Sequence, residues 1–242
     1  MAAAFGWGLL AASSLVIGAI IALVVKLPLR VVGLIMGFGA GVLISAVAFD
    51  LVEEASNTAD DSWSVMVGLF AGCIVFFGGD YLISRMGGGE RKDASGAQQE
   101  GSALAIVLGT VLDGIPESAV IGLTIFKGGA VGTAYLVAVF ISNLPEAISS
   151  TAGLRAGWST AKIMTMWIGI AIVSAIASLL GYVVFQNAGS DVVAFVLAFA
   201  AGAILTMLAD TMIPEAYDNG GKLVGIVTTL GFAVAFTIHT LD

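Results

Sequence analysis

The chain alternates long apolar stretches with short polar or turn-forming breaks along its whole length. A helix needs roughly 20 mainly apolar residues to cross a bilayer, and each long stretch is about that size. The strands of about ten alternating residues that a transmembrane barrel requires are not visible. The pattern predicts eight transmembrane helices, at 5–25, 31–52, 64–85, 103–126, 130–153, 160–186, 192–215 and 221–241.

Composition agrees with a chain that spends most of its length in lipid. Hydrophobic residues make up 59% of it and charged residues 11%, whereas a soluble domain is about 25% charged. We therefore predict an all-α polytopic membrane protein in which 1–242 is a single transmembrane domain. The first apolar stretch has no basic segment before it, so we expect it to be retained and not cleaved as a signal peptide. The Gly-rich polar segment 86–101 is predicted to be a flexible loop.

The basic residues predict an orientation. With the N-terminus outside, only Lys127 of the nine Lys and Arg residues falls at an external helix end. Positive charge collects on the cytoplasmic side of membrane proteins, so both termini should be external and loop 86–101 cytoplasmic. Short loops favour the plasma (inner) membrane of a prokaryote. The cytoplasmic set would be Lys26, Arg30, Arg85, Arg91, Lys92, Arg155, Lys162 and Lys222.

Two internal similarities indicate a repeat. Residues 37–55 align without gaps on 198–216, and 114–119 (GIPESA) resembles 143–148 (NLPEAI). In the predicted topology the members of each pair cross the membrane in opposite directions. Many secondary transporters are built from such inverted repeats around a site near the bilayer midplane. The pairs predict a 3+2+3 arrangement of the eight helices.

Several carboxylates lie inside the predicted spans, whereas no Lys or Arg lies equally deep. A charge at the centre of a membrane helix costs about 2.5–3.5 kcal/mol on insertion scales. These groups must therefore share protons, face water or bind a cation. Asp50 and Asp80 lie near span ends, where reaching the interface is the more frequent explanation. The set is Asp50, Asp80, Asp113, Glu117, Glu146 and Asp210.

Two neighbouring spans concentrate oxygen-bearing side chains. Asp113 and Glu117 are four residues apart and share a helix face. Ser142, Asn143 and Glu146 form a comparable group on the next span. Together they predict a cation site.

A proline precedes each of these glutamates, Pro116 in one span and Pro145 in the next. Proline lacks an N–H and leaves a carbonyl of the preceding turn without its helical partner, and such breaks are tolerated in membranes where they line a cavity. We therefore expect kinked helices. Pro214 repeats the pattern near Asp210. Packing alone also explains proline kinks, but two on adjacent spans favour a site.

The segments DGIPESAVIGL, SNLPEAISSTAGL and AFAAGAILTMLADTMIPEA resemble the fourth, fifth and seventh spans of the ZIP (Zrt/Irt-like) divalent metal transporters. The resemblance covers nearly the whole chain. It implies a two-bundle 3+2+3 fold with a metal site between spans two, four, five and seven. It also implies a secondary transporter that moves a divalent cation such as zinc, iron or manganese into the cytoplasm, with no permanent cofactor.

The resemblance carries over to individual positions, with departures. Glu117 and Glu146 keep the family's glutamates, and Asp113 stands where the family has histidine. Hard oxygen ligands suit Mg²⁺, Ca²⁺ or Mn²⁺, although carboxylates also bind Zn²⁺ and Fe²⁺, so the metal stays open. The implied metal ligands are Asp113, Glu117, Asn143, Glu146, Ser142 and Asp210.

Other functional classes fit less well. An intramembrane hydrolase is disfavoured because His239 is the only histidine, so HExxH is absent, and FGGD at 77–80 lacks the first glycine of a GxGD motif. We expect no enzyme activity and no nucleic-acid partner, since the net charge is −8. A ZIP-like metal sensor or scaffold that does not transport is the alternative. The small residues Gly33, Gly37 and Gly41 permit a homodimer or packing within the chain.

Overall fold

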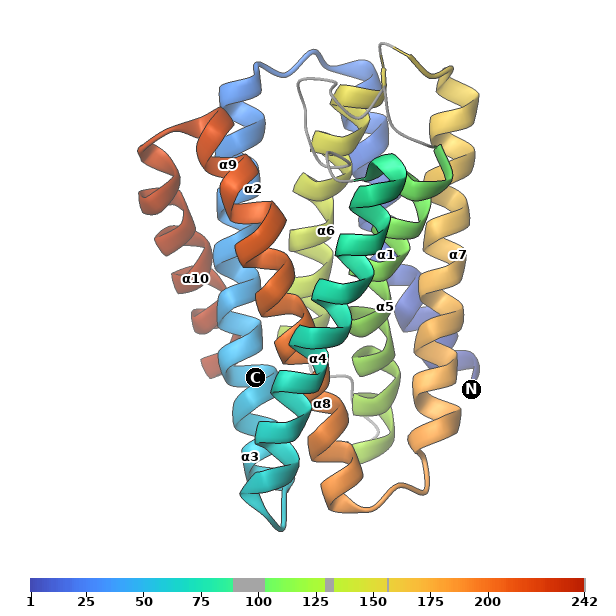
Figure 1. The fold of residues 1–242 in the computed structure, drawn as a ribbon, viewed down its shortest axis with the longest axis vertical. Helices are drawn as coiled ribbons and strands as arrows, with labels where there is room; N and C mark the ends of the chain where they lie inside the picture. Colours follow the sequence, from blue (N-terminus) through green and yellow to red (C-terminus); the bar gives the residue numbers. More distant parts are fainter. Residues whose placement is uncertain (89–102, 129–132, 156, 242) are drawn as a thin grey trace.

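The computed structural model describes residues 1–88, 103–128, 133–155 and 157–241, and these contain helices and short connections but no strand. Figure 1 shows the helices running roughly along the long axis of a bundle. In chain order they are α1 (Ala2–Val24), α2 (Leu29–Ser45), η1 (Ala46–Glu53), α3 (Glu54–Thr58), α4 (Ser62–Ile83), η2 (Ser84–Gly88), α5 (Ala103–Gly128), α6 (Thr133–Leu154), α7 (Thr160–Phe185), α8 (Ser190–Met207), η4 (Leu208–Met212), α9 (Ile213–Gly220) and α10 (Leu223–Leu241).

The wider π-helical turns η1, η2 and η4 continue the helices before them. The chain therefore forms continuous rods over Leu29–Thr58 and Ser190–Gly220, and the helices occupy the eight predicted spans. Seven of the described helices are long and apolar enough to cross a membrane. The remaining one, α6, has 22 residues, which suffices for a span, but several buried polar side chains lower its hydropathy. For the described residues, the prediction of an all-helical chain with several helices long and apolar enough to cross a membrane is confirmed.

Local sequence explains where several helices begin and end. Pro28 precedes α2 in an extended conformation, as expected of a residue that favours helix starts. Asp61 accepts a hydrogen bond from the Trp63 backbone N–H (3.0 Å) at the start of α4. The Ser159 hydroxyl accepts one from the Lys162 N–H (3.3 Å) at the start of α7. Gly221 has φ 68° between α9 and α10, a conformation that glycine adopts without strain.

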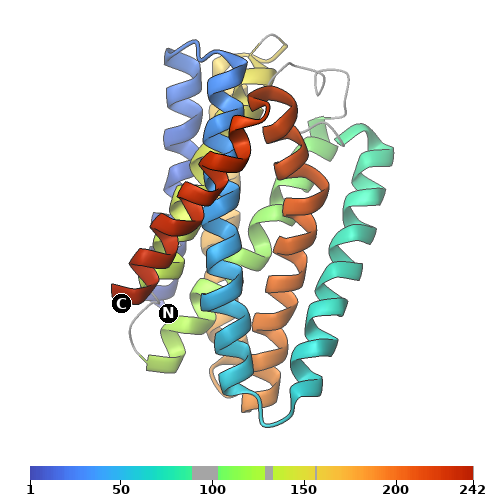
Figure 2. The same cartoon turned by 90° about the vertical axis from the view of Figure 1, so that its left-hand side faces the viewer.

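The two rods that carry the 37–55 and 198–216 similarity form the interior. Of their most apolar windows, 67% and 61% of residues are buried, compared with 22% for α4 and 17% for α10. Figure 2 shows α4 beside α8 and α10 beside α2. Large apolar side chains such as Phe70, Ile74 and Leu230 are exposed on the outer helices, which is the surface that a lipid environment favours.

Equivalent positions of the internal similarity make equivalent contacts. A Cβ added at Gly41 of α2 would overlap the Thr228 carbonyl oxygen of α10, and one added at its counterpart Gly202 of α8 would overlap the Leu69 carbonyl oxygen of α4. Each pair of helices crosses at backbone contact, which only glycine permits.

The reverse contacts match as well. Gly231 of α10 meets the Phe38 carbonyl, and Gly72 of α4 meets that of Phe199; Phe38 and Phe199 are aligned in the repeat. Gly33 and Gly37 also face α9 and α10 of the same chain. All three glycines considered for a dimer interface therefore contact this chain itself.

One end of the bundle carries the basic residues whose side chains are described. It contains the α1–α2 connection, the ends of α4 and α6 and the α9–α10 turn, whereas both termini lie toward the opposite end (Figures 1 and 2). This clustering agrees with the predicted positive side. Within η2, at the start of the predicted loop, Gly87 has a non-helical φ of 88° that marks a kink, and 89–102, with Arg91 and Lys92, lie outside the described residues. The residues at this end are Lys26, Arg30, Arg85, Arg155, Lys162 and Lys222.

Candidate metal centre

The α5 group is buried as its spacing predicts. Asp113 and Glu117 are each 2% exposed, and Thr110, one turn earlier, is also buried. The helix stays continuous across Pro116, so the expected break does not interrupt it. α5 thus presents two carboxylates one turn apart to the interior of the protein.

The α6 group is buried along a longer stretch. Ser142, Asn143 and Glu146 are all at most 7% exposed, and Ser149 and Ser150 of the next turn are buried too. The Ser142 hydroxyl donates to the Val139 carbonyl (3.0 Å), which satisfies its proton within the helix. α6 also continues through Pro145. This helix therefore places amide, hydroxyl and carboxylate oxygens inside the bundle.

Both interior rods approach the proline of α6. A Cβ built on Gly39 of α2 would lie 2.7 Å from Pro145 Cγ and 3.0 Å from Met212 Cε of η4. The absence of a side chain at position 39 lets α2, α6 and η4 meet there. Elements far apart in the sequence thus converge on the polar face of α6.

Helix distortion occurs in the interior rods. In the alignment of 37–55 with 198–216, η4 (Leu208–Met212) corresponds to residues 47–51, which lie inside η1. Both copies of the repeat therefore widen into π-helical turns at equivalent positions. Such turns often mark functional sites. Sequence reasoning did not predict these turns, because a π-helical turn has no clear residue signature.

Tyr135 connects α6 to the α5 group. Its hydroxyl is buried and donates a long hydrogen bond to the Glu117 carbonyl oxygen (3.4 Å). The carboxylates of Glu117 and of Asp50 in η1 both lie close enough to act electrostatically on this hydroxyl. Tyr135 thus links α6 to the backbone of Glu117 in α5.

His239, the only histidine in the sequence, has a specific partner. Its Nδ1 lies 2.7 Å from Asp50 Oδ1, and its ring stands 5.5 Å from that of Phe49. The histidine side chain is 32% exposed and the aspartate 14%. A contact between residues 189 positions apart leaves no local signal, so sequence reasoning missed it.

Asp210 differs from the buried groups in its exposure. It is exposed and lines a groove of about 420 Å³ between α4 and α8, beside Cys73 and Phe77. The following residue, Thr211, is buried, and its hydroxyl donates to the Met207 carbonyl (2.9 Å). Within η4 it is thus Thr211 that faces inward. Asp210 is not part of the centre that we propose below.

The buried carboxylates do not form a ready-made cage. Within the described parts of the chain, no three side chains of the His, Cys, Asp and Glu types come together as a metal cluster. Asp113, Glu117 and Glu146 are all buried, but their carboxylates do not meet at one point where a metal ion could bind all three. A cation held by these residues therefore requires neutral oxygens, such as those of Asn143 and Ser142, or a rearrangement of α5 relative to α6.

Comparison with known proteins finds a similarity that covers most of the chain. The chain is 24% identical over 232 residues to an Arabidopsis thaliana protein named "Putative zinc transporter At3g08650", and the match covers 93% of this chain. The chain spans 36% of that relative's length. No family model matches the sequence. The similarity covers most of the chain, so it is not confined to an isolated motif.

Proposed function

We propose that this protein is a secondary transporter that carries a divalent metal cation across the plasma membrane into the cytoplasm. The observation that carries the proposal is the burial of Asp113, Glu117 and Glu146 in the interior of the bundle. Burying charge in a membrane protein is costly, and such residues commonly mark ion pathways. The name of the Arabidopsis relative points to zinc, and iron and manganese are the other substrates that carboxylate ligands allow.

We assign the metal ligands to α5 and α6. Glu117 and Glu146 supply the central carboxylates, Asp113 a third charge, and Asn143 and Ser142 neutral oxygen donors. Hard oxygen donors of this kind bind divalent cations without a permanent cofactor. Since the carboxylates do not converge in this conformation, the proposed site assembles when α5 and α6 move relative to each other.

The proposed architecture is a 3+2+3 inverted repeat of the ZIP type. It is supported by the matched glycine contacts of Gly41 and Gly202, by the matched positions of η1 and η4, and by the packing of α1 on α6 and of α7 on α5. Two structurally equivalent halves allow alternating access, in which one bundle rocks against the other around a central site. Both termini are then external, and the basic end of the bundle is cytoplasmic.

Uptake into proteoliposomes tests the proposal. Purified protein is reconstituted, and Zn²⁺, Fe²⁺, Mn²⁺, Co²⁺, Mg²⁺ and Ca²⁺ are offered one at a time outside. We expect saturable uptake of at least one of them, with Zn²⁺ the first candidate. Metal-dependent thermal stabilisation without uptake of any metal would instead support the alternative, a sensor or scaffold that keeps the fold without transporting.

A further inference from the structure

At its basic end, the bundle has a cavity whose lining includes none of the proposed metal ligands. It measures about 430 Å³ and lies where the end of α1, the α1–α2 connection and the end of α6 meet. This volume falls within the range of about 300–1,000 Å³ that ligand pockets occupy. The lining residues are Ala22, Val25, Lys26, Leu27, Leu29, Ile148, Ala152 and Arg155.

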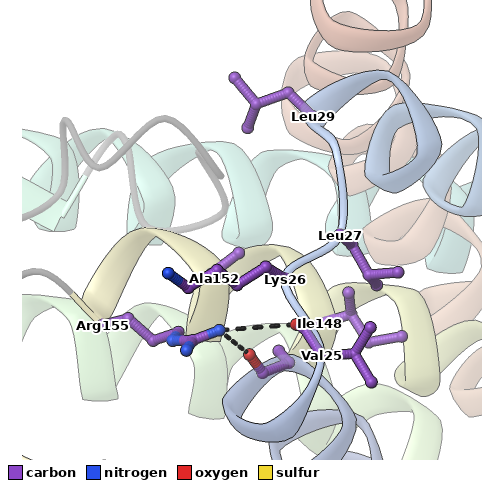
Figure 3. Close-up of a pocket in the computed structure, with 8 residues that line it drawn as sticks. Val25, Lys26, Leu27, Leu29, Ile148, Ala152 and Arg155 are labelled. Carbon is purple, nitrogen blue, oxygen red and sulfur yellow. Dashed lines mark hydrogen bonds between the residues drawn. The ribbon is translucent and has the colours of Figure 1, made fainter.

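Arg155 is held in place at the rim of this cavity. Its Nη1 donates to the Ala22 carbonyl oxygen (2.6 Å) and lies 3.5 Å from that of Val25 (Figure 3). These carbonyls belong to the last turn of α1, where the helix has no N–H partners of its own. Guanidinium has five N–H donors in a rigid fork, so the contact with α1 orients the group and leaves donors for a ligand.

Lys26 adds a second positive charge on the same rim. Figure 3 shows its side chain running across Ala152 on the Arg155 side of the cavity. No carboxylate among the described residues lies within ion-pair distance of Lys26 or Arg155. The two cations are therefore not neutralised by the described chain, and they face a cavity whose other walls are apolar.

A guanidinium fork and an ammonium group beside apolar walls suit an amphiphilic anion. Arginine binds phosphate oxygens in pairs, and lysine adds a point charge. Basic pockets between membrane helices on the cytoplasmic side bind anionic headgroups. A metal cation would be repelled here, so the cavity is distinct from the proposed transport site.

We propose that this cavity binds the phosphate of an anionic phospholipid. Arg155 and Lys26 would contact the phosphate, while Val25, Leu27, Leu29 and Ile148 would accommodate the glycerol backbone and the first acyl carbons. Binding there would fasten the end of α1 to the end of α6. The inference does not depend on the transport function, because it uses none of the residues assigned to the metal.

The test uses the full chain in detergent, titrated with phosphatidylglycerol or with phosphatidylcholine of the same acyl chains. Native mass spectrometry measures retained lipid, and thermal unfolding measures stabilisation. We expect phosphatidylglycerol to bind and raise Tm. Lys26→Gln and Arg155→Lys should each weaken that binding about tenfold, as expected for losing one charge-assisted contact. Arg155→Lys keeps the charge but removes the fork, and the exposed Lys26 can be changed even if Arg155 variants fold poorly.

Lys162→Gln is the matched control. Its amine stands 3.6 Å from the Trp158 ring centroid at the same end of the bundle, outside the cavity, and its loss should leave lipid binding unchanged. Equal binding of phosphatidylcholine, unchanged binding in both cavity variants or an equal loss in Lys162→Gln would each overturn the proposal. Inorganic phosphate is a separate arm, and stabilisation by it equal to that by the lipid would show a free-phosphate site instead.

Discussion

His239 Nδ1 of α10 lies 2.7 Å from Asp50 Oδ1 of η1, so the last helix is joined to the π-helical turn of the second span. Asp50 also acts electrostatically on Tyr135, whose hydroxyl donates to the Glu117 backbone. The contact between His239 and Asp50 is itself partly exposed, at the edge of the bundle. It lies at the end of the molecule where both termini are found.

Replacing His239 tests how much this contact stabilises the fold. His239→Ala should lower the free energy of unfolding by about 1 kcal/mol, the usual worth of a hydrogen bond with a partly buried partner. His239→Gln retains a donor for Asp50 and should lose less. Thermal unfolding of the purified variants in detergent measures both. Equal Tm values for Ala, Gln and wild type would show that the contact contributes nothing.

The close helix contacts at Gly41 and Gly202 predict that neither position tolerates a larger side chain. Gly41→Ala and Gly202→Ala should each destabilise the protein by about 1–3 kcal/mol, the usual cost of overpacking, because the new methyl group meets a backbone carbonyl of the neighbouring helix.

Gly225→Ala and Gly78→Ala serve as controls for these variants. Both positions lie within helices and have nothing within 4 Å of an added Cβ, so the change should be neutral or slightly stabilising. Thermal unfolding compares the four variants. If Gly41→Ala and Gly202→Ala have the same Tm as the control variants, the close backbone contacts between these helices are contradicted.

A buried hydrogen bond joins α6 and α7. Trp167 Nε1 donates to Thr151 Oγ1 at 2.8 Å, and both side chains are fully buried. Thr151→Val keeps the shape but leaves the indole N–H without its acceptor, which should cost about 1–3 kcal/mol. Thr151→Ser keeps the acceptor and is the control. Unfolding measurements in which Val is no worse than Ser would contradict the contact.

Replacing Asp210 tests whether the metal ligands include this residue or come from α5 and α6 alone. Because Asp210 is exposed in the α4–α8 groove, Asp210→Asn should leave metal uptake near the wild-type rate, whereas Glu146→Gln should abolish most of it. The comparison uses initial rates in proteoliposomes with equal amounts of inserted protein. A loss for Asp210→Asn as large as that for Glu146→Gln would return Asp210 to the ligand set.

The sequence predicted the features that depend on local pattern. Hydropathy placed the helices to within a few residues, since apolar length alone determines a span. The spacing of Asp113 and Glu117 predicted their shared buried face. The aligned Gly41 and Gly202 indicated a repeat whose contacts the structure matches.

The remaining features depend on contacts between distant elements or on small shifts of helical register. The pairing of His239 with Asp50 needs α10 to be placed against η1, which no local pattern encodes. Asp210 faces outward and Thr211 inward within a π-helical turn, and ideal helical spacing does not predict such a turn. Whether carboxylates on α5 and α6 come together as a metal cluster likewise depends on how the two helices pack, which no local pattern encodes.

The most direct test of the transport proposal is the initial rate of Zn²⁺ uptake into proteoliposomes by the wild type and by the Glu117→Gln, Glu146→Gln double variant. Glu53→Gln, which changes an exposed carboxylate of η1, is the matched control. We predict saturable uptake by the wild type and the control, and uptake no faster than protein-free liposomes for the double variant. Wild-type rates in a folded, correctly inserted double variant would contradict the assignment of these two glutamates as the central metal ligands.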